Sequence, residues 1–310
     1  MHKSIEKAEA FSPAGISSFF EICDEKADGS PIKDPKCVGS RGGGFVIEKG
    51  VYTKAFARQS PKNQIEITIN GKDAQKAETT KAVVQEFLKR SKQNYEIKIE
   101  HRIEVPMASG YGSSGAGALS TALALEQILN IGLTYNEMGV IAHIAEVENK
   151  TGLGTVGPLM IGGCVLTTKS GAPGFSVIDR IALKPNYKIA SIYFGQILTK
   201  KVLIKQNIKS KINESGKKAL DSILKKPTLE NFMNSSKKFA QEIGFLTDRS
   251  AEAIGRLERA GAIGVTQNMI GDAVHSIVEE ENEDRIIDSV KEIGNKLIVS
   301  RISNAGAKLL

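Results

Sequence analysis

The stretch VPMASGYGSSGAGALSTALALEQILN, Val105 to Asn130, places a glycine- and serine-rich segment directly against a helix-forming run. Residues 109–117 contain four glycines and three serines, and a long alanine and leucine run follows at once. The alternating sequence YEIKIEHRIEV over Tyr95–Val105 predicts a half-buried strand in front of this segment. The order is therefore strand, flexible turn and buried helix.

This order predicts an anion site at the start of the helix. The first helical turn has free backbone N–H groups and the positive end of the helix dipole. Glycines let the backbone approach an anion without a Cβ in the way, so the segment is suited to cradle phosphate. Ser113 and Ser114 could bond phosphate oxygens or help to hold Mg²⁺. The alternative interpretation is a tight turn that serves packing alone.

The segment does not support either of two better known phosphate-binding motifs. The segment has no GxxxxGK[ST] pattern, because no lysine follows the glycines. Gly110, Gly112 and Gly115 fit GxGxxG, but no regular alternation of parallel strands and helices surrounds them, and a lone match of this kind is weak.

Composition indicates an ordinary globular protein. The chain has 310 residues, of which 41% are hydrophobic and 25% charged, and a net charge of +7. The positive charge is spread over many short segments, without a zinc-finger or RNA-recognition motif, so nucleic-acid binding is not expected. Basic charge also suits an enzyme that acts on anionic substrates.

Location and redox chemistry follow from two further observations. The first ten residues, MHKSIEKAEA, are polar, and the longest apolar stretch, Ala116–Leu133, holds too many polar residues to span a bilayer. We expect a cytoplasmic protein without membrane contact. The cysteines Cys23, Cys37 and Cys164 show no CxxC spacing, which argues against a disulfide framework or a zinc site.

The remaining pattern predicts strands mixed with helices, an α+β class. The sequence TYNE, beginning at Thr134, is a capping box that predicts a second helix ending near Asn149. The sequence KSGAPG interrupts the pattern near Ser170 and suggests domains at 1–170 and 171–310. Helices are expected over 79–92, in parts of 200–226, over 229–261 and over 284–291, and strands over 51–56, 64–69, 188–194, 262–266, 273–278 and 296–302. Residues 8–22 alternate but contain a turn signal, FSPAG.

The sequence PMASGYGSSGA, residues 106–116, closely resembles the second motif of the GHMP kinases, PxxxGLGSSAA. Phe11–Ile16 resembles the first motif of this family, and Gly152–Pro158 with the later Gly162-Gly163 resembles the stretch before its glycine turn. Gly264–Asp272 stands in the place of the third, glycine-rich motif but lacks the usual run of glycines.

Several segments also look like the archaeal pantoate kinases of this family: SPAGISSFFEI, GSRGGG, AEVENKTGLGTV and TQNMIGDAVHSIV. The resemblance covers residues 10–310. It implies an N-terminal domain like domain 2 of ribosomal protein S5 and a ferredoxin-like C-terminal domain. It also implies ATP-dependent phosphorylation of the 4-hydroxyl of (R)-pantoate for coenzyme A synthesis, and a homodimer.

The resemblance assigns nucleotide binding to the glycine segment: Met107, Ala108, Ser109, Gly110, Gly112, Ser113, Ser114, Gly115 and Ala116. In the family a loop serine and a helix glutamate hold Mg²⁺, which here implies Ser114 and Glu146. Glu148 points some 200° away around the helix, so only one of these glutamates can face the site. His143 lies on the same face as Glu146 and could bind substrate or orient the glutamate.

Catalysis and substrate binding are less determined by the sequence. Many kinases of the family carry an aspartate near the position of Thr155, but this chain has none, so Thr155 is a candidate to bond the attacking hydroxyl. Arg41 is a natural partner for the pantoate carboxylate, with Ser40 beside it. Ser17 and Ser18 are candidates for the pantoate hydroxyls. Homoserine, shikimate or mevalonate kinase activity, or a non-catalytic nucleotide-binding regulator, remain the alternatives.

Overall fold

The computed structural model of the chain describes residues 5–74, 76–195, 206–294 and 296–310. Its strands are β1 (Glu6–Cys23), β2 (Gly39–Gln59), β3 (Gln64–Ile69), β4 (Lys72–Asp73), β5 (Tyr95–Ile103), β6 (Cys164–Lys169), β7 (Val177–Ile181), β8 (Tyr187–Gly195), β9 (Gly264–Gln267), β10 (Asp272–Glu279), β11 (Lys296–Arg301) and β12 (Lys308–Leu309). Its helices are α1 (Glu78–Arg90), α2 (Ser113–Leu129), α3 (Tyr135–Asn149), α4 (Val156–Ile161), α6 (Gln206–Lys225), α7 (Leu229–Ile243), α8 (Asp248–Arg259), α9 (Glu283–Val290) and the 3₁₀ helix η1 (Glu280–Asn282).

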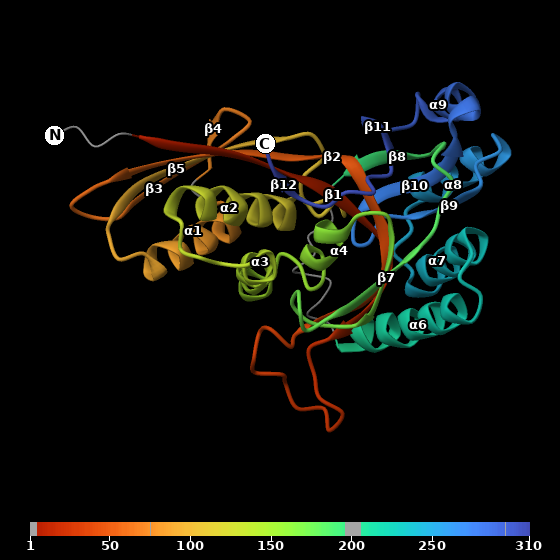
Figure 1. The fold of residues 1–310 in the computed structure, drawn as a ribbon. Coiled ribbons are helices and arrows are strands. Elements are labelled where there is room, and N and C mark those ends of the chain that lie inside the picture. Colours follow the sequence, from red (N-terminus) through yellow and green to blue (C-terminus); the bar gives the residue numbers. More distant parts are fainter. Residues whose placement is uncertain (1–4, 75, 196–205, 295) are drawn as a thin grey trace.

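Two sheets organise these elements. The larger has eight strands, six of them in the order β12-β1-β2-β5-β3-β4. The other two extend the sheet from the N-terminal part of β2, which pairs with β6, and β6 pairs with β7. The smaller is an antiparallel sheet of order β11-β8-β10-β9. In Figure 1, helices α1 and α2 lie against one face of the larger sheet, α3 packs on these two helices, and α6 and α7 lie beneath the C-terminal end of β1 and the N-terminal end of β2. The predicted mixture of strands and helices is confirmed.

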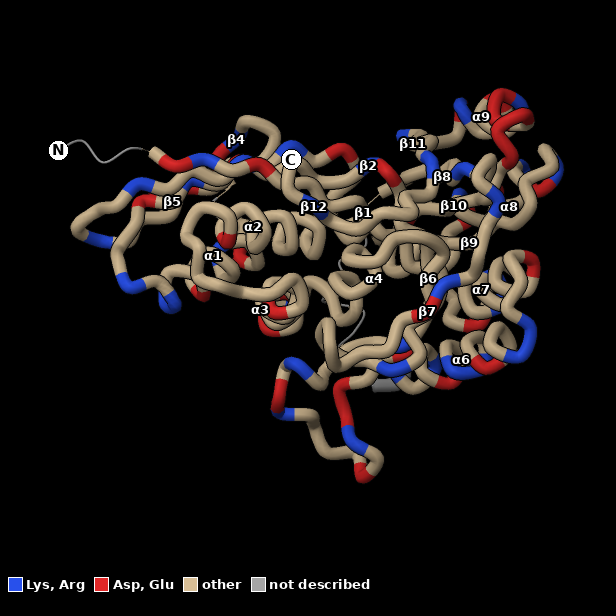
Figure 2. The backbone as a smooth tube through the Cα atoms, in the orientation of Figure 1, with Lys and Arg blue, Asp and Glu red and all other residues tan. Residues whose placement is uncertain are grey.

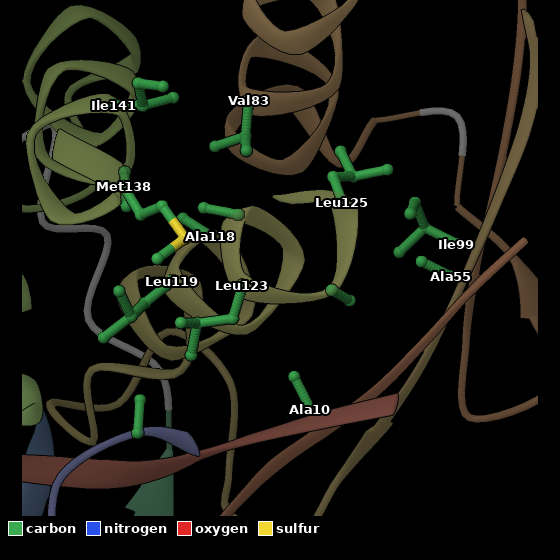
Figure 3. Packing of buried hydrophobic residues seen from close by; sticks show 14 of the residues in the cluster. Ala10, Ala55, Val83, Ile99, Ala118, Leu119, Leu123, Leu125, Met138 and Ile141 are labelled. Atoms are coloured by element: carbon green, nitrogen blue, oxygen red, sulfur yellow. The ribbon is translucent and has the colours of Figure 1, made fainter. Parts of the chain in front are cut away.

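Helix α2 is the centre of the first core. Its buried face carries no charge, and alanines alternate with leucines so that α1, α3 and the sheet all approach it closely. Figure 3 shows Leu119, Leu123 and Leu125 of α2 among side chains of α1, α3 and the sheet, including Val83 and Met138. The alanine and leucine run after the glycine segment therefore fixes the loop to a helix buried in the first core.

The predicted capping box at the start of α3 is confirmed. Glu137 N donates to Thr134 Oγ1 at 3.3 Å, and Thr134 N donates to Glu137 Oε2 at 2.7 Å. One helix prediction was wrong. Residues 229–261 form two helices, because Gly244 adopts a left-handed conformation that ends α7, and Thr247 caps α8 with its side chain.

The two sheets meet at a shared core, which contains Phe19 and Phe45 of the long strands and Phe232 of α7. The rings of Phe45 and Phe232 pack edge to face, with their centroids 5.1 Å apart. The predicted boundary near Ser170 falls inside the β6–β7 hairpin of the larger sheet. The two-domain division stays a prediction, and a boundary between β7 and β8 would agree better with the sheets.

Charged side chains of both signs are interspersed over the surface. Figure 2 shows Lys and Arg next to Asp and Glu along α6, α7 and the long segment between β1 and β2. Ion pairs such as Lys209 with Asp24 and Glu25, each at 2.6 Å, join this segment to α6. Among the described residues no helix is long and apolar enough to cross a membrane.

Two buried histidines with strongly lowered pKa values should make the protein sensitive to mild acid. Burial lowers the pKa of His101 to about 4 and that of His275 to about 3. Both imidazoles stay neutral in the folded state at pH 5.5, whereas the unfolded chain takes up protons near pH 6.5. The unfolded state therefore binds more protons below that pH, and the free energy of unfolding falls as the pH falls.

We expect the free energy of unfolding to drop by roughly 3 kcal/mol between pH 7.5 and pH 5.5, about 1.4 kcal/mol for each of these histidines. Urea unfolding at constant ionic strength and several pH values measures this drop. Equal or greater stability at pH 5.5 would show that these imidazoles are protonated in the fold.

Candidate active site

A cavity of 460 Å³ opens where the long strands, the glycine segment and the turn after β9 come together. The residues around it come from five separated segments, namely 15–24, 38–46, 108–114, 147–158 and 269–270, together with Val165 and Thr167. Three of these segments are the motifs that the sequence singled out. The fold thus brings most of the predicted site residues to one place.

The glycine segment forms the predicted turn into a helix. Three of its residues have positive φ angles: Ala108 at 55°, Gly110 at 78° and Gly112 at 62°. Gly112 is the N-cap of α2, and no side chain caps this helix. Its first-turn N–H groups are therefore left for a ligand or water, as a phosphate site requires. A Cβ on Gly112 would lie 2.6 Å from Thr155 Cγ2, so the turn also needs glycine for space.

Glu146 of α3 lies directly behind this turn and is only 2% exposed. Its Oε1 accepts hydrogen bonds from Ser114 Oγ at 2.5 Å and from Thr151 Oγ1 at 2.9 Å. Glycines make room for the other oxygen, since a Cβ on Gly115 or Gly152 would lie 2.8 or 2.2 Å from Oε2. Burial raises the pKa of Glu146, and the two hydroxyl bonds lower it only in part. Glu148 is exposed, so Glu146 is the glutamate that faces the loop.

The pair of Ser114 and Glu146 fits a magnesium ion. A hydroxyl and a carboxylate are the hard oxygen ligands that Mg²⁺ prefers. Among the described residues Glu146 has hydroxyl partners but no cationic one, which leaves a buried charge that a cation would balance. The described residues contain no group of three or more His, Cys, Asp or Glu side chains able to hold a metal. Phosphate oxygens and water would have to complete the coordination.

Thr155 lies on the other side of the turn as the N-cap of α4. Its side chain lines the cavity and lies so close to Gly112 and Gly115 that a Cβ on either glycine would approach it. No side-chain hydrogen bond to the helix occupies its hydroxyl. Thr155 is therefore within the cavity and next to the turn, where an attacking hydroxyl would have to lie.

Arg41 lines the cavity on strand β2, directly opposite Glu21 in the register with β1. Glu21 Oε2 accepts from Arg41 Nε at 2.9 Å and from Nη2 at 2.5 Å. The ion pair fixes the guanidinium, and no hydrogen bond of Nη1 occurs among the described residues, so Nη1 is available to an incoming anion. Ser40 and Ser17 also line the cavity. The Oγ of Ser40 lies so close to Gly154 that a Cβ there would be 2.2 Å from it.

Two predicted substrate residues do not line the cavity, and these assignments need correction. Ser18 is fully buried and its hydroxyl bonds His275 Nε2 at 2.9 Å, whereas its neighbour Ser17 lines the cavity. Ser18 is the extra residue of β1 between Ser17 and Phe19 in the register with β2. His143 is also buried, and its Nε2 donates to Val38 O at 2.9 Å. The segment between β1 and β2 covers His143 and separates it from the cavity.

Some of the residues predicted to bind nucleotide line the cavity, and others do not. Ala108, Ser109, Gly110, Gly112, Ser113 and Ser114 line the cavity. Gly115 and Ala116 are buried in α2 behind it. Met107 is 44% exposed and does not line the cavity, although its carbonyl accepts from Ser109 Oγ at 2.8 Å. Nucleotide contact by these three residues stays a prediction that the geometry makes less direct.

Comparisons with known proteins agree with this geometry. A family model described as the GHMP kinases N terminal domain matches residues 78–163, the part that contains the turn and the Glu146 helix. The pantoate kinase of Methanocaldococcus jannaschii is 32% identical over 272 residues, which cover 87% of this chain and 93% of that protein. This chain belongs to the GHMP kinase family. The pantoate kinase of Thermococcus kodakarensis is 30% identical over 281 residues, 89% of each chain.

A solved structure confirms the GHMP kinase fold predicted from the sequence. It is described as a phosphotransferase related to the CoA biosynthesis pathway, and it superposes with a TM-score of 0.89 at 26% identity over 98% of this chain and 99% of that one. GHMP kinases are phosphotransferases that use ATP with Mg²⁺. The pair of Ser114 and Glu146 is the part of this GHMP kinase best suited to hold that ion.

The GHMP kinase cavity also contains residues that the sequence did not single out. Lys150 lines its wall beside Thr151, and no carboxylate among the described residues lies within ion-pair distance of it. It is therefore available to an anionic ligand. Phe19, Phe20 and Ile22 form an apolar wall near Arg41. These residues looked like ordinary loop and core positions, and only the folded chain places them together.

Proposed function

We propose that this GHMP kinase transfers the γ-phosphoryl group of ATP to the 4-hydroxyl of (R)-pantoate and forms 4-phosphopantoate for coenzyme A synthesis. The observation that carries the proposal is the match to an archaeal pantoate kinase over 87% of this chain. The cavity supports it, because an arginine suited to a carboxylate and a turn suited to phosphate face the same space.

The proposed roles follow from the positions of the side chains. The N–H groups at the start of α2 hold the phosphates of ATP, and Ser114 and Glu146 hold Mg²⁺. The bound ion supplies charge neutralisation at the phosphates. Arg41 binds the carboxylate of pantoate, with Ser17 and Ser40 close to its hydroxyls. Thr155 orients the 4-hydroxyl, whose oxygen forms the new bond to phosphorus as the bond to ADP breaks.

The proton of that hydroxyl needs an acceptor other than a carboxylate beside Thr155. Asp24 is the carboxylate among the described lining residues, and it comes from the far end of β1. A phosphate oxygen or water would take the proton, as a loose phosphoryl-transfer transition state permits. Catalysis would then depend on positioning and electrostatic stabilisation.

The test is ADP release with a panel of acceptors: (R)-pantoate, homoserine, shikimate and mevalonate. We expect pantoate to give the highest kcat/KM and mass spectrometry to identify one added phosphoryl group. Faster turnover of another acceptor would overturn the substrate assignment. ATP binding without turnover of any hydroxy acid would instead favour a nucleotide-binding regulator.

A cytoplasmic location and a homodimer belong to the same proposal. They are supported by the resemblance to the family and not by any contact in the chain itself. Size-exclusion chromatography with light scattering would measure the number of subunits.

A further inference from the structure

Five polar side chains form a hydrogen-bonded chain in the core behind the cavity wall. They come from five places in the fold, and all are at most 1% exposed. The five are Ser18 of β1, Tyr111 of the glycine segment, Ser191 of β8, Asn268 of the turn between β9 and β10, and His275 of β10.

The bonds leave each donor with an acceptor. Asn268 Oδ1 can only accept, so His275 Nδ1 donates to it at 2.8 Å, and Nε2 accepts from Ser18 Oγ at 2.9 Å. Ser191 Oγ donates to the carbonyl of Val274 at 2.8 Å. It therefore accepts from Tyr111 OH at 2.7 Å and from Asn268 Nδ2 at 3.4 Å. Asn268 joins the two halves of the chain.

This polar chain ties together three segments that line the cavity. Tyr111 is itself part of the glycine segment, and its carbonyl accepts from Gly15 N at 3.2 Å. Beside Asn268, Met269 N donates to Ser17 O at 2.8 Å. The turn also packs on the glycine segment without space, since a Cβ on Gly271 would lie 2.4 Å from Ser109 O.

Apolar side chains at these buried positions would have avoided the free-energy cost of burying polar groups. The polar chain lies in the shared core, where the rings of Phe45 and His275 pack edge to face with their centroids 5.8 Å apart. Buried polar groups cost free energy unless every member is paired, but a fully paired network holds one unique arrangement. Such an arrangement matters most where a turn with three positive φ angles must keep its N–H groups aimed at a ligand.

We propose that Ser18, His275, Asn268, Ser191 and Tyr111 are positioning residues that hold the glycine segment in its nucleotide-binding conformation. The segment in the place of the third motif, Gly264–Asp272, lacks the run of glycines usual in the family and acts here by bracing the glycine segment from behind. The inference rests on the proposed binding of nucleotide phosphates at that segment. It does not depend on the identity of the acceptor.

The chain offers a matched pair of variants for the test. Ser18→Ala removes a hydroxyl that donates to Nε2 of the buried His275. Thr80→Val removes a hydroxyl at 3.1 Å from Nε2 of the buried His101, in the core between α1 and the sheet and away from the cavity. Both changes delete one buried hydroxyl bond to a histidine, so their losses of stability should be similar.

The readouts are the Kd of an ATP analogue with Mg²⁺, by titration calorimetry, and hydrogen exchange of residues 107–112 in the free protein. We expect Ser18→Ala to raise the Kd at least fivefold and to speed the exchange of this segment, as Tyr111→Phe should also do. Thr80→Val should leave both unchanged. Melting temperatures confirm that all three variants fold.

Equal changes in Ser18→Ala and Thr80→Val, or no change in Ser18→Ala, would overturn the inference. A raised Kd in Ser18→Ala, in a protein that does not phosphorylate pantoate, would support the bracing and overturn only the proposed substrate. The exchange measurement needs no nucleotide, so unchanged exchange of residues 107–112 also counts against the bracing.

Discussion

Replacing Glu146 with glutamine should lower kcat about a thousandfold while leaving the fold intact. The side chain keeps its shape and one oxygen, but it loses the charge that would hold Mg²⁺ beside Ser114. A factor of a thousand corresponds to about 4 kcal/mol of transition-state stabilisation, the order expected for a metal that neutralises developing charge. The measurement is steady-state kinetics at saturating pantoate and ATP over a titration of Mg²⁺.

The stability of this variant separates a functional carboxylate from a structural one. Glu146 is buried without a cationic partner among the described residues, and burial raises its pKa, so its charge destabilises the free protein. Glu146→Gln should therefore melt at the same or a higher temperature than the natural chain. A large fall in melting temperature would show that the lost activity reflects damage to the fold.

Glu148→Gln is the matched control. It makes the same chemical change two residues along the same helix, at an exposed position. We expect its kcat to stay within twofold of the natural chain. A Glu146→Gln variant that keeps more than a third of the natural kcat would remove this residue from the metal site, and Ser114→Ala, expected to lose at least tenfold, would then have to be reinterpreted.

The glycine segment and its helix could be predicted because their signals are local. The change from a glycine-rich run to an alanine- and leucine-rich run marks the turn, and the capping box at Thr134 marks the next helix. The choice between Glu146 and Glu148 could not be made from the sequence. Helical geometry shows that only one faces the turn, but which one depends on how α3 packs against α2.

The wrong substrate residues show what local reasoning leaves out. Ser17 and Ser18 are neighbours on β1, but the strand has an extra residue between Ser17 and Phe19 in its register with β2, so simple alternation does not say which serine faces the cavity. That irregularity depends on the pairing of β1 with β2 and has no local signal. The burial of His143 was not predictable, because Val38 belongs to a segment about a hundred residues earlier whose path over α3 has no local signal. The break at Gly244 was available from the sequence, since a glycine with Thr247-Asp248 three residues later marks the end of one helix and the start of the next.

Ion pairing across strands is a further property that the sequence does not reveal. Glu21 and Arg41 lie opposite each other only because two irregularities set the register, one with extra residues on β2 opposite Pro13 and Ala14 and one with an extra residue, Ser18, on β1. The sequence predicts Arg41 as a partner for the pantoate carboxylate, but its Nε and Nη2 already bond one oxygen of Glu21. This pairing changes what should be expected when Arg41 is replaced.

Arg41→Ala should raise KM for pantoate about fiftyfold, with KM for ATP and kcat within about twofold of the natural values. Glu21 holds the Nε edge of the guanidinium, and the other edge, formed by Nη1 and Nη2, stays open to a carboxylate in the cavity. A charged hydrogen bond of this kind contributes about 1.5–3 kcal/mol, and a fiftyfold change is about 2.3 kcal/mol. An equal rise in both KM values would place Arg41 outside the pantoate site.

Part of that rise would come from Glu21 and not from the lost arginine contact. Glu21 is only 17% exposed, and without Arg41 its carboxylate would repel an anionic substrate. The double variant Glu21→Gln with Arg41→Ala removes this repulsion, so the KM rise that remains measures recognition by Arg41 itself. The amide of pantoate, which lacks the negative charge, provides the second comparison. The natural chain should strongly prefer pantoate over the amide. The double variant should lose most of that preference, because Arg41 is the cationic residue that β2 contributes to the described cavity wall.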